Sequence, residues 1–325
     1  MIWRIITGAV LAVVLAFGGA LGLVFTQNPK DMSGQSAVDF SLWANDSGED
    51  AAPLQPLRMA DGYDLMVRTY GGADNVPLLV ILHGAGWHGL GLDKLANGLS
   101  GHADVIVPDL RGHGTSPGER GTLSYIGEFE DDLARMIYML KKPDQKIIMA
   151  GHGAGGGLVM RFAGGPFGGL LDGAVLLAPS LGPKATTVRQ PSDRWNHVLS
   201  RRILGLRFLN AFGITALNHL PVVQINMPKD VLDGPIGDTA TTSYSYNLNA
   251  SYGPHRDYLA DVAALPPFIV IAGTADPLSV ADQYAPTMGA VTDKGRYDLL
   301  LGASHLGVVD DPRTLGIIKG FLDEF

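Results

Sequence analysis

Residues 146–162 read KIIMAGHGAGGGLVMRF and contain the feature that decides the fold. The apolar run at 146–150 predicts a strand, a glycine-rich turn follows at 151–155, and residues 157–162 are typical of a helix. A strand, a sharp turn and a helix in this order present the nucleophile of the pattern G-x-S-x-G. Here the central position is Gly153, which has no side chain. The turn is therefore present while its nucleophile is absent.

The chain from residue 54 onward alternates strand-like and helix-like segments. Continuous apolar runs, typical of parallel strands buried on both faces, recur along it, whereas residues 128–140 have helical periodicity. The expected strands are 64–70, 77–82, 104–108, 146–150, 173–178, 267–272 and 297–301, and a final helix is expected at 315–325. This alternation predicts an α/β fold with a doubly wound, mostly parallel sheet.

The alternation stops between the expected strands 173–178 and 267–272. The segment between them is too long for a loop inside a compact domain. We therefore expect a core formed by residues 54–181 and 265–325, with a cap inserted at 182–264 over one end of the sheet. Five apolar residues of this cap are candidates for an acyl-binding wall or for the cap's own core, namely Leu204, Leu206, Phe208, Leu209 and Phe212.

The N-terminus contains an uncharged apolar run at 5–25 that is long enough to cross a bilayer as a helix. We expect residues 1–27 to be a retained transmembrane anchor outside the fold, with a cleaved signal peptide as the alternative. Arg4 favours an N-terminus inside the cell, so the body would be extracytoplasmic, and secreted or periplasmic if the segment is cleaved. Residues 28–53 are predicted to be a linker. Its Phe40 and Trp43 can dock on the domain or on the lipid surface, but we expect them to pack locally.

The composition excludes several classes of partner. A net charge of −8 argues against a nucleic-acid partner, because phosphate binding needs clustered lysine and arginine. The chain has no cysteine, so disulfides and thiolate metal sites are excluded. Its nine histidines are scattered without ligand spacing. We therefore expect neither a metal nor another cofactor, and a small-molecule partner rather than a nucleic acid.

Two candidate site residues follow the last two expected strands. Asp276 lies in GTADP at 273–277 and His305 in GASH at 302–305. The carboxyl ends of parallel strands converge on one crevice. A carboxylate there can orient a histidine, which then acts as a base and an acid. A lone histidine in a loop is more often structural, but the order turn, aspartate, histidine places this pair in an active-site cleft.

Two further motifs follow expected strands. HGAGWHG at 83–89 contains glycines that can turn backbone N–H groups toward a developing oxyanion, although a simple tight turn also explains them. DLRGHGTS at 109–116 is interpreted as a charged turn that braces the sheet.

With these motifs the chain resembles the α/β-hydrolases, and within them the monoacylglycerol lipase and lysophospholipase group. The resemblance covers about residues 55–325 and rests on HGAGWH at 83–88, DLRGHGTSPGERG at 109–121, the turn at 151–155, GTADP and GASH. It is weakest in the cap. It implies hydrolysis of a carboxylic ester, such as a monoacylglycerol or a lysolipid, through an acyl-enzyme.

The resemblance also implies a role for each matching position. It implies that Asp276 is the triad acid, that His305 is the triad histidine, and that the backbone N–H groups of Ala85 and Ala154 form the oxyanion hole. The nucleophile falls on Gly153, where this chain departs from the family. The neighbouring motif residues are His83, Gly84, Gly151, His152 and Gly155.

The missing serine can be understood in three ways. Covalent catalysis needs an oxygen or sulfur nucleophile, which Gly153 does not offer, and Ser304 lies on the wrong loop to replace it. The glycine is an engineered change, or it marks a natural pseudoenzyme, as in the N-myc downstream-regulated family, or His305 activates a water in the vacated site. The retained Asp276 and His305 favour a recent or engineered loss, or the water reaction. We expect an inactive or slow ester hydrolase, with a non-catalytic lipid or small-molecule binding module as the alternative.

A different fold also fits the same turn. Gly151, Gly153 and Gly156 match the dinucleotide-binding pattern G-x-G-x-x-G between a strand and a helix. An acidic residue should then end the next strand, but Asp172 precedes that strand, at the end opposite to the ribose. We therefore keep a dinucleotide-binding fold only as a remote alternative.

Overall fold

The computed structural model describes residues 1–44, 48–71, 75–115, 118–190 and 195–325. Parts of three predicted features lie outside the described residues: positions 45–47 of the linker, Ser116 and Pro117 of the 109–121 motif, and positions 191–194 of the inserted cap.

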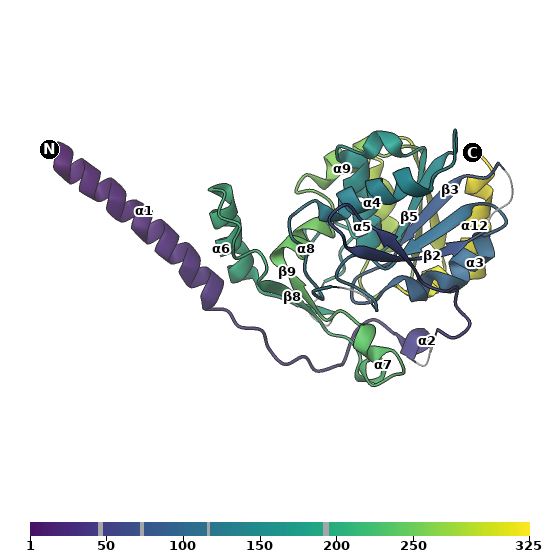
Figure 1. Cartoon of the computed structure of the whole chain (residues 1–325), viewed down its shortest axis with the longest axis horizontal. Coiled ribbons are helices and arrows are strands. Elements are labelled where there is room, and N and C mark those ends of the chain that lie inside the picture. Colours follow the sequence, from purple (N-terminus) through teal and green to yellow (C-terminus); the bar gives the residue numbers. More distant parts are fainter. Residues whose placement is uncertain (45–47, 72–74, 116–117, 191–194) are drawn as a thin grey trace.

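An eight-stranded sheet forms the centre of the molecule (Figure 1). Its strand order is β1-β2-β4-β3-β5-β6-β10-β11; β2 pairs antiparallel with both β1 and β4, and the other pairs are parallel. The strands are β1 (Gln55–Arg58), β2 (Asp64–Tyr70), β3 (Leu78–Leu82), β4 (Asp104–Pro108), β5 (Ile147–His152), β6 (Gly173–Leu177), β10 (Phe268–Gly273) and β11 (Gly295–Leu300). The predicted doubly wound, mostly parallel sheet is confirmed, and the exposed, proline-containing strand β1 was not predicted.

Helices cover both faces of this sheet. Successive side chains of a strand point to opposite faces, so an apolar strand has apolar side chains on both faces, and both must be buried. In β3, Leu79 and Ile81 join a core with α3 and α12, while Leu78, Val80 and Leu82 join a second core with α4 and α5. The helices around the sheet are α3 (Asp93–Leu99), α4 (Glu128–Leu140), α5 (Ala154–Gly164), α9 (Tyr258–Ala264), α10 (Tyr284–Met288), α11 (Gly307–Asp310) and α12 (Pro312–Leu322). Burial on both faces explains why the central strands are apolar throughout.

Between β6 and β10 the chain forms a second, smaller layer. We call residues 182–264 the insertion. Its strands pair antiparallel in the order β7-β8-β9. Its elements are β7 (Asn196–Val198), α6 (Ser200–Ala211), β8 (Pro221–Ile225), α7 (Lys229–Leu232), β9 (Ser243–Ser245) and α8 (Tyr246–Ser251), and its last helix is α9, which packs on α5 of the core. These strands are short and partly polar, so the sequence did not indicate them.

The C-terminal part of the N-terminal helix α1 (Ile2–Phe25) packs against α6, and the rest of α1 extends away from the body (Figure 1). The contact is close because Gly205 has no side chain: a Cβ there would lie 2.5 Å from the carbonyl oxygen of Ala20. Phe17 packs against Phe208 and Phe212, with ring centroids 5.4 and 5.2 Å away. The expectation that this segment stands outside the fold is therefore wrong for its last turns.

This contact also changes the interpretation of the apolar residues of α6. Phe208 and Phe212 contact Phe17 of α1, which accounts for these apolar rings without an acyl-binding wall. Leu206 and Leu209 are buried in the insertion, whereas Leu204 is exposed. The alternative, that these residues belong to the core of the insertion, holds for the buried pair.

The segment between α1 and β1 packs on the domain over part of its length. It contains the short helix α2 (Ser41–Ala44). The rings of Phe40 and Trp43 are buried, with Phe40 stacked on Trp195 and Trp43 stacked on Trp87. The Asn226 side chain accepts from the backbone N–H of Gly34, which ties the segment to the insertion. Phe40 and Trp43 therefore dock on the domain, and the expectation of purely local packing is wrong for these two rings.

Candidate active site

The turn after β5 has the backbone geometry of a nucleophile elbow. Gly153 has φ 54° and ψ −114°, in the region of positive φ that favours glycine. Its N–H donates to the carbonyl oxygen of Leu177 (2.9 Å), and its own carbonyl oxygen accepts from Ser180 (2.8 Å). These bonds hold residue 153 at the end of β5, with α5 starting at the next residue.

The flanking glycines allow the turn to close. A Cβ at Gly151 would lie 2.4 Å from the backbone of Gly155, and a Cβ at Gly155 would lie 2.4 Å from the carbonyl oxygen of His83. Neither contact is possible for a real side chain. Both positions therefore require glycine for a steric reason that is independent of chemistry at residue 153.

Asp276 and His305 form a hydrogen-bonded pair beside this turn. Asp276 follows β10 and His305 follows β11, the neighbouring strand. The Nδ1 of His305 lies 2.7 Å from Oδ2 of Asp276. Because an ionised carboxylate only accepts, Nδ1 carries the proton and Nε2 keeps its lone pair. A Cβ at Gly153 would lie 3.3 Å from that Nε2, so the histidine faces the position of the missing side chain.

The Asp276 carboxylate is stabilised in its charged form. Burial by itself would raise its pKa, but His305 and the hydrogen bonds that it accepts outweigh burial and lower the pKa from 3.8 to about 2. Its donors include the backbone N–H groups of Leu278 and Ser279 and the Ser279 hydroxyl, at 2.7, 3.1 and 2.6 Å. Asp276 is therefore an anion across the physiological pH range. Ser279 had not been identified from the sequence, because an Asp-x-x-Ser pattern in a loop is too common to be informative.

His152 supports the loop that carries His305. Its Nε2 lies 3.0 Å from the carbonyl oxygen of His305, and the two rings are 4.6 Å apart. Burial, followed by the charge of His305, lowers the pKa of His152 to about 3, so its imidazole is neutral. Its Nε2 therefore donates to the carbonyl, and the side chain fixes the position of the histidine loop.

The turn after β3 approaches the same place. Gly155 touches the carbonyl ends of Leu82 and His83, which brings the start of this turn against the start of α5. Ala85 and Ala154 are both partly exposed. Ala154 is the first residue of α5, so its N–H has no partner within the helix. His83 itself points into the protein, where its Nε2 accepts from the N–H of Leu110 (3.1 Å) and burial lowers its pKa to about 4.

The motif at 109–116 braces the sheet, as expected. Asp109 accepts from Arg68 on β2 (3.3 Å) and from the N–H of Gly89 (2.8 Å). The guanidinium of Arg111 donates two bonds of 2.8 Å to Asp132 on α4 and one of 2.7 Å to Asp61. These charges are paired with one another, so they do not form a substrate site.

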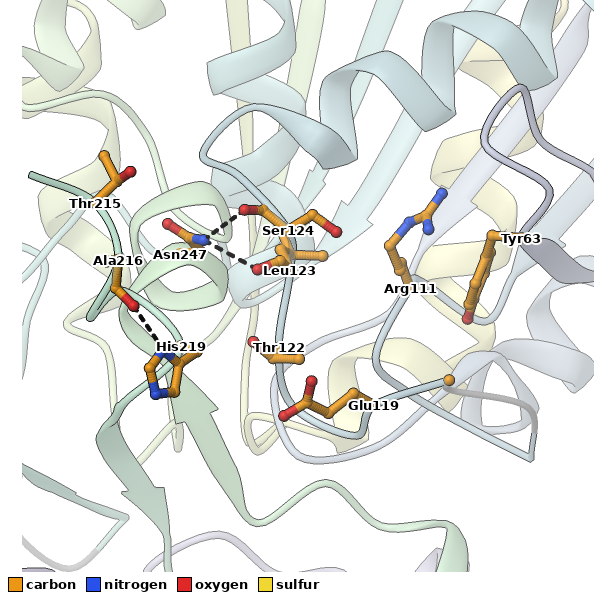
Figure 2. Close-up of a pocket in the computed structure, with 11 residues that line it drawn as sticks. Tyr63, Arg111, Glu119, Thr122, Leu123, Ser124, Thr215, Ala216, His219 and Asn247 are labelled. Atoms are coloured by element: carbon orange, nitrogen blue, oxygen red, sulfur yellow. Dashed lines mark hydrogen bonds between the residues drawn. The ribbon is translucent and has the colours of Figure 1, made fainter. Parts of the chain in front are cut away.

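A separate pocket of about 460 Å³ lies between the core and the insertion (Figure 2). Its lining includes Tyr63, Arg111, Thr122, His219 and Asn247, but not Gly153, Asp276 or His305. The guanidinium of Arg111 is already paired with carboxylates, as described above. We therefore locate the candidate chemistry at residue 153 and not in this pocket.

The strand order and the turn geometry exclude the dinucleotide-binding alternative. Antiparallel β2 lies between β1 and β4, and the turn at Gly153 faces a histidine and not open space for a pyrophosphate. The glycines that matched the pattern are instead required by the close packing of β5, α5 and the turn after β3.

Comparisons with known proteins agree with this fold. An uncharacterized protein of Mycobacterium bovis is 26% identical over 300 residues, which cover 84% of this chain and 82% of that protein. A soluble variant of the monoglyceride lipase from Saccharomyces cerevisiae superposes with a TM-score of 0.65 at 16% identity, over 86% of this chain and 97% of that variant. A membrane phospholipase A described as a bacterial virulence factor superposes over 99% of this chain and 97% of the phospholipase chain, with a TM-score of 0.56 and 18% identity.

A family model, described as serine aminopeptidase S33, matches residues 73–306. The match includes the turn at Gly153 together with Asp276 and His305. It extends over well more than half of the chain, and the architecture around it is that of the esterase and lipase folds. The chain belongs to the serine aminopeptidase S33 family of α/β-hydrolases.

Proposed function

We propose that this protein is a carboxylic ester hydrolase of the esterase and lipase type in which glycine occupies the nucleophile position, so that the chain as written is inactive or slow. One observation carries the proposal: a side chain at residue 153 would begin 3.3 Å from Nε2 of His305, whose other nitrogen is held by Asp276. Among the described residues beyond its chain neighbours, no other polar atom lies within 4 Å of that position.

With serine at residue 153, each group has a defined step. The serine Oγ attacks the ester carbonyl carbon while Nε2 of His305 takes its proton, and Asp276 stabilises the imidazolium. The N–H groups of Ala85 and Ala154 stabilise the oxyanion. The imidazolium then gives its proton to the leaving alcohol, and water repeats the sequence to release the acid.

With glycine at residue 153, only a direct reaction is available. A water in the vacated position donates its proton to Nε2 of His305 and attacks the carbonyl carbon without an acyl-enzyme. The tetrahedral adduct then collapses to the acid as the ester C–O bond breaks, and the imidazolium returns the proton to the leaving alcohol. Removal of a triad member elsewhere leaves roughly 10³–10⁴-fold acceleration over water, from the oxyanion donors and substrate binding. The same pocket without turnover would be a binding module, which is the rival function.

Ester hydrolysis by four forms of the full chain in detergent distinguishes these functions. The forms are the chain as written, Gly153→Ser, Gly153→Ala and His305→Ala, assayed with p-nitrophenyl acetate and a long-chain monoacylglycerol. We expect Gly153→Ser to exceed Gly153→Ala by about 10³-fold or more. If the form with glycine at residue 153 is active and His305→Ala abolishes that activity, the water reaction is supported. If no form cleaves either ester, the hydrolase proposal fails and the binding module replaces it.

We also propose that residues 1–27 are retained as a membrane anchor and that the substrate is lipid-derived. The 24 residues of α1 span about 36 Å, more than the roughly 30 Å of a bilayer core. The Arg201 side chain donates to the carbonyl oxygen of Thr26, and the Arg202 side chain donates to those of Val24 and Gln27. These hydrogen bonds mark a polar boundary at the C-terminal end of α1. From there α6 runs back along α1 toward Phe17, which would bring part of the insertion into the lipid.

The anchor proposal has a direct test. Membranes that contain the full chain are washed with alkaline carbonate, and the mass of the purified protein is measured. An anchor keeps the protein in the membrane pellet with residues 1–27 present in the mass. A mass that lacks the N-terminal segment would establish the cleaved signal peptide instead, and release of the full-length chain by carbonate would refute the anchor.

A further inference from the structure

Two tyrosines of the insertion bond to the turn that carries Ala85. Tyr244, on β9, accepts a hydrogen bond of 2.6 Å from the backbone N–H of Gly86. Tyr252, just after α8, has its hydroxyl 2.8 Å from the carbonyl oxygen of His83 and 3.0 Å from that of Gly84. The backbone is therefore held on both sides of Ala85 by side chains that come from outside the core.

The direction of the Tyr244 hydroxyl is fixed by His113. Nδ1 of His113 lies 3.1 Å from the carbonyl oxygen of Arg111, which can only accept, so Nδ1 carries the proton. Nε2 of His113 then accepts from the Tyr244 hydroxyl at 3.0 Å. The hydroxyl oxygen is left to accept from Gly86. Burial, followed by His83, lowers the pKa of His113 well below 6.5, so this arrangement persists at neutral pH.

The two tyrosines are also fixed by packing. Tyr244 is 3% exposed and Tyr252 is 4% exposed. Their ring centroids lie 5.3 and 5.4 Å from that of His113 and 5.9 Å from each other. Gly86 is buried with φ 86°, and a Cβ there would lie 2.9 Å from the methyl carbon of Met227 on the insertion. Loss of the Tyr244 hydroxyl would thus leave the Gly86 N–H buried without its partner.

We propose that Tyr244 and Tyr252 are positioning residues, which hold the turn at residues 83–86 so that the Ala85 N–H faces the carbonyl oxygen of a substrate at residue 153. This inference rests on the proposed function, in which that N–H stabilises the oxyanion. Neither tyrosine touches the reacting atoms; each acts through the backbone of the turn. The insertion then completes the oxyanion hole through these two side chains. If the insertion moved away from the core, the turn would lose its hydrogen bonds to both tyrosines.

The kinetic test uses Gly153→Ser as the parent and compares Tyr244→Phe with Tyr246→Phe. Tyr246 lies two residues along the same segment and is also buried, but within the described chain its hydroxyl makes no hydrogen bond to residues 83–86. A displaced oxyanion donor acts mainly on the transition state. We expect Tyr244→Phe to lower kcat by about tenfold or more with KM within about twofold, and Tyr246→Phe to change neither. Equal kcat values for the two variants would overturn the proposal.

Hydrogen–deuterium exchange of the peptide that covers residues 83–88 gives a second readout, which needs no activity. Tyr244→Phe should speed exchange in this peptide but not in β10, whereas Tyr246→Phe should leave both unchanged. If Gly153→Ser hydrolyses no ester, the proposed function fails and exchange alone decides whether Tyr244 holds the turn. Unchanged exchange in Tyr244→Phe refutes the positioning role. Tyr252→Phe repeats both measurements from the other side of the turn and replaces Tyr244→Phe if that variant does not fold.

Discussion

A side chain at residue 153 should reduce stability, and serine should reduce it less than alanine. The backbone at Gly153 has φ 54° and ψ −114°, a sparsely populated combination that costs a residue with a Cβ about 1–3 kcal/mol. Loss of glycine's freedom in the unfolded chain returns about 0.4–1 kcal/mol. Gly153→Ala should therefore destabilise the fold by about 1 kcal/mol. Serine adds a hydrogen bond to Nε2 of His305, worth about 1 kcal/mol, so Gly153→Ser should have nearly the stability of the glycine form.

Thermal unfolding of the full chain in detergent measures these differences. In a domain of this size 1 kcal/mol corresponds to roughly 2–4 °C in Tm. We expect Gly153→Ala to melt lower than the glycine form by that amount, and Gly153→Ser to melt above Gly153→Ala. In a His305→Ala background, the gap between serine and alanine should close, because the hydrogen-bond partner is gone. An alanine form as stable as the glycine form would refute the argument from backbone geometry, and a gap that survives without His305 would refute the argument from contact.

Three further outcomes are expected. Gly151→Ala should prevent folding or lower Tm severely, because its Cβ would lie 2.4 Å from backbone atoms, whereas Gly169→Ala, with open space around it, should be tolerated in circular dichroism and melting. Trp43→Ala should cost about 3 kcal/mol by removing a buried ring, and Trp3→Ala, at an exposed position, should leave Tm unchanged. The third outcome concerns the buried histidines His83, His113 and His152, which are neutral in the folded protein. Tm should fall as the pH decreases from 6.5 to about 4, because the unfolded chain then binds more protons than the folded one, and each histidine contributes a loss of up to about 2 kcal/mol at about pH 5. A flat profile of Tm against pH would contradict the neutral state of these histidines.

The main sheet was predictable because its signal is local. Strands buried on both faces are apolar at every position, so β3, β5, β6 and β10 were evident as continuous runs. The same regularity indicates that Asp276 and His305 follow neighbouring strands, where they form a hydrogen bond. Their catalytic roles remain a prediction.

The contacts of the insertion were not predictable from local patterns. Strands β7 and β9 have three residues each, too few for a period to be visible. The bond between Tyr244 and Gly86 joins positions 158 residues apart, and a tyrosine in a polar segment gives no sign of such a partner. The packing of α1 on α6 depends on Gly205, and a single glycine inside a helix does not indicate which element packs against it.

The aromatic cluster behind the turn at residues 83–86 makes the protein's own fluorescence an optical probe of that turn. Of the four tryptophans, Trp43 and Trp87 stack with ring centroids 6.2 Å apart, and Trp195 stacks on Phe40. A Cβ at Gly86 would lie 3.7 Å from the ring of Trp195. The tryptophan emission of a protein commonly reports on many regions at once. Here three of the four tryptophans lie around the turn at residues 83–86. We therefore expect a movement of this turn to change the tryptophan emission, which can be followed without a label and without turnover.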